Sequence, residues 1–219
     1  MDNSTKNFIF TGSVVVLILT ATFFYVKKQK SERKLPYYIY NASSNKAYQA
    51  NSPTNTVGEF SFTNQEGKNI TPKQIGNVVY VADYFFVTCP GICKTMSTQL
   101  QRVYSTFENE PDFKIVSHTA KPEEDSVEAL MGYAVQYGVK DHNKWLFLTG
   151  DKKELYHTAR KQYAIIDDEG DGGEDDFIHT ERFALIDKHQ FVRGYYDGTD
   201  SNEVNKMMED IRILLNEKK

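Results

Sequence analysis

The chain contains two cysteines, Cys89 and Cys93, and their spacing is the strongest chemical signal in the sequence. They follow a run of β-branched and aromatic residues, Asn77 to Thr88, and open α/β sheets place ligand sites at this end of their strands. Pro90 suits a first helical turn, and residues i and i+4 of a helix share one face. We therefore expect both sulfurs to lie beside a helix N-terminus, where the partial positive charge favours a thiolate.

Three roles fit this pair. As structural residues, the cysteines would be small buried hydrophobic side chains. As a redox pair they would exchange dithiol for disulfide, although dedicated oxidoreductases have two intervening residues and this chain has three. As metal ligands, two thiolates favour a soft ion such as Cu(I). Zinc fits less well, because a structural zinc site needs four protein ligands and there is no further cysteine.

Among the five histidines, His179 has the best position for a third ligand. It precedes the strand pattern Arg182 to Asp187, at an edge from which a sheet neighbour could reach the cysteines. His118 ends another strand pattern and is a weaker candidate. The alternative for His179 is an ordinary surface histidine at the start of a strand.

Seven carboxylates lie between residues 167 and 176, directly before His179. Their charge and the glycines among them predict a solvated, mobile loop, which would let His179 move onto a metal ion or away from it. Carboxylates are poor ligands for Cu(I), so the loop itself is not assigned to the metal.

The surrounding elements alternate between strand and helix patterns. After the cysteines, apolar residues recur at helical spacing, and the later patterns end in a strand pair and a closing helix. This order predicts an α/β, thioredoxin-like fold with a central, mostly parallel sheet flanked by helices and an antiparallel edge pair. The expected elements are a hairpin at 60–68, strands at 77–88, 113–119 and 145–149, helices at 123–137 and from Asp151 to Tyr163, a hairpin at 182–196 and a helix from Ser201.

The N-terminus carries an apolar segment, residues 8–26, which has no charged residue and is long enough to cross a bilayer as one helix. A cleaved signal peptide is the alternative, but a small-x-small cleavage site is missing. We predict a membrane anchor at residues 1–26, a tether at 27–56 and one domain at 57–219. The net charge of −4 argues against nucleic-acid binding.

Several segments resemble the Sco/SenC family of copper-binding assembly factors. The segment FFVTCPGIC at residues 85–93 resembles the family signature, and VSHT (116–119), WLFLTG (145–150) and DFIHT (176–180) match in the same order. The resemblance spans residues 57–216. It implies a thioredoxin-like fold, an N-terminal membrane helix, and delivery of copper to the binuclear copper centre of cytochrome c oxidase.

By position in these motifs, the resemblance implies that Cys89, Cys93 and His179 bind copper. Two thiolates and an imidazole suit Cu(I), and the same set with an extra ligand can hold Cu(II), so the oxidation state stays open. The expected protein is a chaperone without catalytic residues. The alternative is a thiol-disulfide reductase in which Cys89 and Cys93 form the redox-active disulfide. Gly91 departs from the family pattern, where many members have Asp.

The resemblance also implies partners and a location. The expected partners are the copper-bearing subunit of the oxidase and other copper chaperones or thiol-disulfide proteins. The expected location is the cell inner membrane, with the domain facing the periplasm. The lysines and arginines after the apolar segment argue for the opposite orientation, although that rule weakens for large translocated domains.

Overall fold

The computed structural model describes residues 18–22, 33–41, 44, 46–52 and 56–217. The chain divides into two units, Met1–Lys34 and Leu35–Lys219. Most of the predicted anchor lies outside the described residues, and residues 18–22 within it are helical, with exposed Ile18 and Leu19. In the described part of the chain, no helix is both long and apolar enough to span a bilayer.

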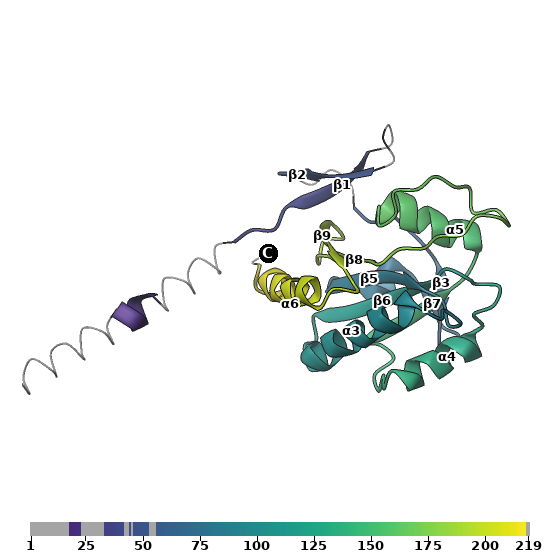
Figure 1. Ribbon diagram of the computed structural model, residues 1–219, viewed down its shortest axis with the longest axis horizontal. Helices are drawn as coiled ribbons and strands as arrows, with labels where there is room; N and C mark the ends of the chain where they lie inside the picture. Colours follow the sequence, from purple (N-terminus) through teal and green to yellow (C-terminus); the bar gives the residue numbers. More distant parts are fainter. Residues whose placement is uncertain (1–17, 23–32, 42–43, 45, 53–55, 218–219) are drawn as a thin grey trace, which may run out of the picture. The chain divides into compact units, whose positions relative to one another are not determined.

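One mixed sheet forms the centre of the second unit (Figure 1). Its strand order is β2-β1-β9-β8-β5-β6-β7-β3-β4. Within the described residues, the strands are β1 (Tyr37–Asn41), β2 (Lys46–Ala50), β3 (Phe62–Asn64), β4 (Asn69–Ile70), β5 (Val79–Phe85), β6 (Phe113–Thr119), β7 (Trp145–Thr149), β8 (Arg182–Ile186) and β9 (Val192–Asp197).

The prediction of a mostly parallel sheet is wrong. Only the pairs β5–β6 and β6–β7 are parallel, and the other pairs of the described sheet are antiparallel. Helical crossovers join β5, β6 and β7, whereas short turns close the hairpins β1–β2, β3–β4 and β8–β9, and a short turn can join only antiparallel neighbours. The parallel part is therefore restricted to the strands that lead to the cysteines and their neighbours.

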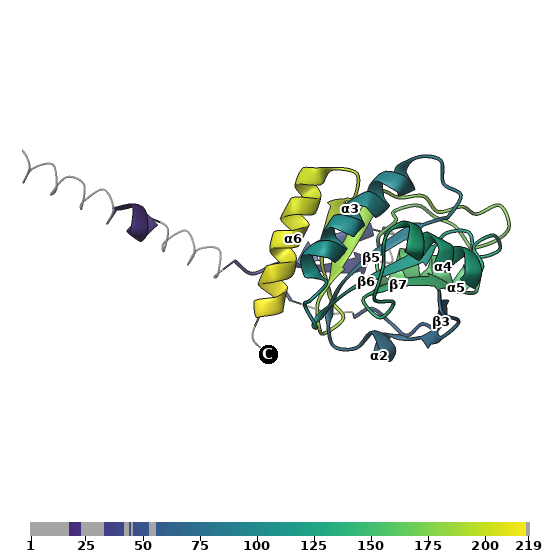
Figure 2. The same ribbon diagram turned by 90° about the horizontal axis from the view of Figure 1, so that it is seen from below.

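Helices cover both faces of this sheet (Figures 1 and 2). Helices α3 (Ile92–Phe107), α4 (Val127–Gln136) and α6 (Ser201–Asn216) pack on one face. Helix α5 (Lys152–His157), which continues as the π-helix η1 (Thr158–Gln162), packs on the other, and the short α2 (Pro72–Ile75) precedes β5. The predicted apolar positions of α3 are buried, so helical spacing located this face correctly: Met96, Leu100, Val103 and Phe107.

The compact unit begins at Leu35, inside the stretch predicted as a tether. Strands β1 and β2 pair along their full length there, with Ile39 opposite Tyr48. The β1 sequence, YYIYN, is rich in residues that favour strands, but its polar surroundings resemble a linker. The hairpin therefore belongs to the sheet, and it precedes the predicted boundary at residue 57, which stays a prediction.

Arg193 of β9 holds this early segment against the rest of the unit. Its buried guanidinium donates hydrogen bonds to the carbonyl oxygens of Leu35, at 2.8 Å, and Pro36, at 3.0 Å. It also pairs with Asp187, at 2.8 Å, and with Glu217 after α6, at 2.8 and 3.1 Å. A buried guanidinium is stable only when its donors are paired, and these partners supply that pairing.

Candidate metal centre

The two cysteines lie on either side of the start of α3. Cys93 is the second residue of the helix, and Cys89 lies in the turn after β5, with its backbone N–H donating to the carbonyl of Phe86 at 3.2 Å. We expected both residues within one helix, but the N-cap is Gly91, so Pro90 precedes the helix. The reason is that Pro90 disfavours helical backbone angles at the residue before it, which is Cys89.

The two sulfurs interact directly, and the pKa values of the two thiols are shifted in opposite directions. Burial raises the pKa of Cys89, but a hydrogen bond from the Cys93 thiol and the backbone N–H groups of Gly91 and Cys93 outweigh it, so the pKa is lowered. Burial, the hydrogen bond to Cys89 and the nearby charge of Asp83 raise the pKa of Cys93 to about 12. Both are free cysteines with exposures of 4% and 3%. Cys89 therefore loses its proton more easily than Cys93 does.

Asp83 is a carboxyl group in the interior, on the β5 face that packs against α3. It accepts a hydrogen bond from the Ser117 hydroxyl, which accepts one from the Trp145 indole at 2.9 Å. Burial raises the pKa of Asp83 to about 7. The sequence does not point to Asp83, because a single Asp inside an apolar strand pattern does not show which side chains will pack against it.

The cysteine-bearing turn is fixed from the neighbouring strand. The backbone N–H of Val87 donates to both carboxylate oxygens of Asp125, at 3.2 and 3.3 Å, and the hydroxyl of Thr119 donates to the same carboxylate. Asp125 is buried, so these bonds are shielded from water. The turn is therefore held by a group that follows β6 and that sequence reasoning did not identify.

His179 lies in the extended segment that leads into β8, and its side chain is exposed. Its neighbours Ile178 and Thr180 are buried, so alternate residues of this segment face opposite sides. Phe177, which shares the side of His179, packs edge-on against Phe86 at 5.5 Å between ring centroids. The histidine segment therefore lies beside the turn that carries Cys89.

The described residues include no group of three or more His, Cys, Asp or Glu side chains arranged to hold a metal ion. The structure brings Cys89 and Cys93 together and puts the segment of His179 next to their turn. His179 as a third ligand stays a prediction. The donor set itself, two neighbouring cysteine sulfurs and an exposed imidazole, has the chemistry that soft copper ions prefer.

The chain matches a family of known proteins. The SCO1/SenC family model matches residues 48–216, which is most of the chain. This chain belongs to the SCO1/SenC family. The match extends to residue 48, inside β2, so it reaches further towards the N-terminus than the resemblance at residues 57–216.

Three SCO1/SenC relatives are especially informative. A SCO1 protein homolog from Bacillus subtilis (strain 168) is 30% identical over 158 residues, which cover 71% of this chain and 81% of the relative. The crystal structure of a SCO1/SenC family lipoprotein from Bacillus anthracis str. Ames has a TM-score of 0.63 and 26% identity, and covers 73% of this chain and 94% of the other. BsSco, described as a cytochrome c oxidase assembly protein with a disulfide switch, has a TM-score of 0.63 and 27% identity, with coverages of 74% and 95%.

His118 is excluded from the cysteine site of this SCO1/SenC protein. It is buried on the opposite face of the sheet, stacked on Tyr84 at 5.0 Å, and burial lowers its pKa to about 3. The side chain is therefore a neutral part of the second apolar cluster.

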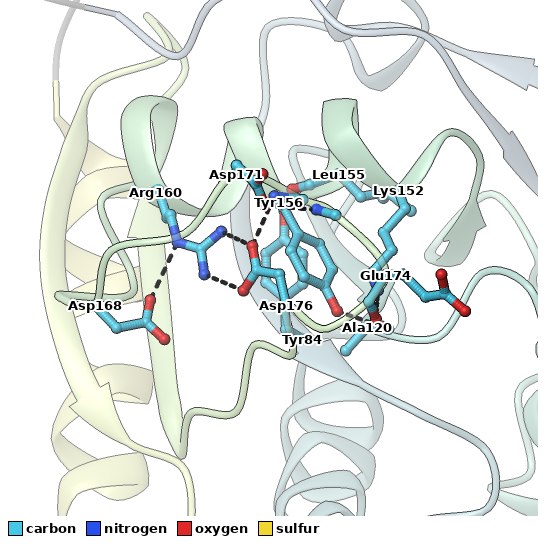
Figure 3. A network of polar contacts seen from close by, with 12 residues as sticks. Tyr84, Ala120, Lys152, Leu155, Tyr156, Arg160, Asp168, Asp171, Glu174 and Asp176 are labelled. Carbon is cyan, nitrogen blue, oxygen red and sulfur yellow. Dashed lines mark hydrogen bonds and ion pairs between the residues drawn. The ribbon is translucent and has the colours of Figure 1, made fainter.

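The acidic loop of this SCO1/SenC protein, residues 167–176, is attached at both ends (Figure 3). Asp176 and Asp168 bind the guanidinium of Arg160 in η1, and Asp167 pairs with Arg182 at 2.9 Å. The sequence predicts a freely solvated loop, because it does not reveal that a distant arginine lies underneath. In the described structure these ion pairs fix the loop next to the histidine segment.

Proposed function

We propose that this SCO1/SenC protein is a copper chaperone that binds copper through Cys89, Cys93 and His179 and helps to assemble the binuclear copper centre of cytochrome c oxidase. The observation that carries the proposal is the contact between the sulfurs of Cys89 and Cys93, in which the pKa of the Cys89 thiol is lowered by the Cys93 thiol. Thiolates and imidazole suit Cu(I), and the same ligands with one addition can hold Cu(II).

Copper binding is linked to the loss of protons from this pair. Cu(I) bound to both sulfurs needs both as thiolates, so the protons that they hold are released, and the pKa shifts make Cys93 the harder of the two to deprotonate. The exposed imidazole of His179 supplies nitrogen from the outer side of the site. Transfer then proceeds by exchange of these ligands for the thiolates of the copper-bearing oxidase subunit, or of another copper chaperone.

A Cu(I) titration of the reduced protein, with a competing chelator, tests the proposal. The wild-type protein should bind one copper ion, Cys89→Ser and Cys93→Ser should abolish stoichiometric binding, and His179→Ala should weaken it severely. His189→Ala, a change at an exposed histidine of the β8–β9 turn, is the matched control and should bind as the wild-type protein does. If His179→Ala keeps full affinity, the third-ligand assignment is wrong.

A second function is a thiol-disulfide reductase that keeps the copper-site cysteines of the oxidase reduced, and the unequal pKa values of the pair favour it. The Cys89 thiolate attacks the partner's disulfide and one partner thiolate leaves and takes up a proton. The Cys93 thiol then loses its proton and attacks Cys89, which releases the second partner thiol and leaves a Cys89–Cys93 disulfide. Reduction that survives His179→Ala, together with weak copper binding by the wild-type protein, would favour this function.

We also propose that residues 8–26 anchor the protein in the cell inner membrane, with the copper-binding domain facing the periplasm. The apolar length of the segment supports the anchor, and the related protein from Bacillus anthracis str. Ames is a lipoprotein. A reporter enzyme that is active only outside the cytoplasm, fused after residue 219, should be active. An inactive but stable fusion would contradict this orientation.

A further inference from the structure

The carboxylate of Asp176 lies three residues before His179 and is held by several donors at once. The guanidinium of Arg160 donates two parallel hydrogen bonds to it, each of 2.8 Å. The backbone N–H of Gly172 donates a third bond, at 2.7 Å. The side chains of Arg160 and Asp176 are 5% and 10% exposed, so water competes weakly for this pair.

The same guanidinium binds both ends of the acidic loop. Its Nε donates to Asp168 at 3.1 Å, while its two terminal nitrogens bind Asp176 (Figure 3). Arg160 lies in the π-helical turn η1, and such turns change the direction of a side chain relative to a regular helix. Lys152 of α5 adds a bond to the carbonyl of Glu174 at 3.2 Å, so this side of the loop is bound to α5 and η1.

Tyr156 makes a second connection from the same helical segment. Its hydroxyl donates to the carbonyl of Ala120 at 2.8 Å, and the backbone N–H of Ile178 lies near the same hydroxyl. Ala120 in turn donates its N–H to the carbonyl of Phe85, the last residue of β5, at 2.7 Å. Two hydrogen bonds therefore join the strand before the cysteines to Tyr156, whose hydroxyl lies near the residue before His179.

We propose that Tyr156 and Arg160 are positioning residues for His179, which hold its segment so that the imidazole can complete the copper site. This inference rests on the proposed role of His179 as a ligand. Because the apparent affinity of a site falls in proportion to the fraction of molecules in the competent arrangement, loss of these bonds should weaken copper binding without any contact to copper.

Two conservative substitutions test the proposal with a matched control. Tyr156→Phe removes one hydroxyl and keeps the ring. Tyr84→Phe removes another buried hydroxyl, which donates to the carbonyl of Leu155 in the same helix at 2.8 Å but has no bond to the histidine segment. Arg160→Lys keeps the charge but cannot form the parallel pair of bonds to Asp176.

The first measurement is hydrogen exchange of the reduced, copper-free protein. Tyr156→Phe and Arg160→Lys should each speed exchange in residues 172–180 by about three- to tenfold, the effect of losing one hydrogen bond, and leave residues 92–107 unchanged. Tyr84→Phe should leave residues 172–180 unchanged. Equal exchange in all variants, or equal acceleration throughout the domain, would overturn the proposal.

The second measurement is copper affinity, with and without His179. Tyr156→Phe should weaken Cu(I) binding by about three- to tenfold in the wild-type background and have no further effect in His179→Ala. Equal effects in both backgrounds would mean a general structural role and would overturn the inference. If His179→Ala itself binds copper normally, the ligand assignment fails, whereas the exchange data still report whether the two residues hold the segment.

Discussion

The turn that carries the cysteines and the segment that carries His179 are held in different ways. The sulfurs are buried, the thiol of Cys93 interacts with the sulfur of Cys89, and the turn is fixed by the buried carboxylate of Asp125. The imidazole is exposed, and its segment depends on side chains of α5 and η1. Half of the proposed copper site is thus part of the core, and the other half is attached to it by polar bonds that can open separately.

This difference predicts that substitutions beneath the cysteines change the free energy of unfolding more than substitutions near the histidine do. The largest effect is expected at Asp83, whose folded pKa of about 7 lies above its ordinary value of 3.8. The folded state therefore binds a proton at Asp83 more tightly than the unfolded state does. The stability that this proton contributes is fully present below pH 3.8 and is lost as the pH rises through 7.

Asp83→Asn removes this pH dependence. Relative to the wild-type protein, the variant should gain about 3 kcal/mol in the free energy of unfolding between pH 4 and pH 8, with the change levelling off above the folded pKa. Urea unfolding of the reduced, copper-free proteins measures it. Parallel pH profiles for the two proteins would show that Asp83 is ionised in the folded state across this range.

Asp125→Ala should destabilise the protein by about 2 kcal/mol, because the half-buried N–H of Val87 and the buried hydroxyl of Thr119 lose their acceptor. It should also speed alkylation of Cys89, since the turn is no longer fixed. Asp125→Asn keeps an acceptor oxygen and should cost less. Equal losses in the two variants would contradict the role of the hydrogen bonds.

Asp176→Asn tests the histidine half and should cost about 1 kcal/mol at neutral pH. The hydrogen bonds from Arg160 hold the pKa of Asp176 below its ordinary value, although burial acts in the opposite direction. The Asp176 carboxylate therefore stabilises the folded state above pH 3.8, and this stabilisation is lost as the pH falls through the lowered pKa of the folded protein. Unfolding at a series of pH values should show the two proteins converging in acid, and a constant difference would contradict the assignment.

The smallest effect is expected at Phe177, which is 44% exposed where it meets Phe86. Phe177→Ala should change the free energy of unfolding by about 0.5 kcal/mol. The ring of Phe86, on the cysteine side of the same contact, packs against both apolar clusters. Phe86→Ala should therefore lower the free energy of unfolding by about 2 kcal/mol. Similar values for the two variants would remove the distinction between the halves of the site.

The same distinction explains what could be predicted from the sequence. The cysteine pair, the apolar face of α3 and the strands beside it were predictable, because they depend on short-range patterns. The pairing of Arg160 with Asp176 was not, since both residues read as ordinary surface charges until the fold brings them together. Likewise, YYIY at residues 37–40 shows strand propensity but not which edge of the sheet will accept it.

Arg193 has a consequence for the connectivity of the domain. One guanidinium binds the carbonyl of Leu35, where the compact unit begins, and the carboxylate of Glu217, at the end of its last helix. The two ends of the domain are therefore neighbours in space, so a short glycine-rich linker can join them. A circular permutant with new ends in the β1–β2 turn should fold and keep its cysteine pair, whereas a truncation that starts at residue 48 would leave a buried cation without two of its acceptors.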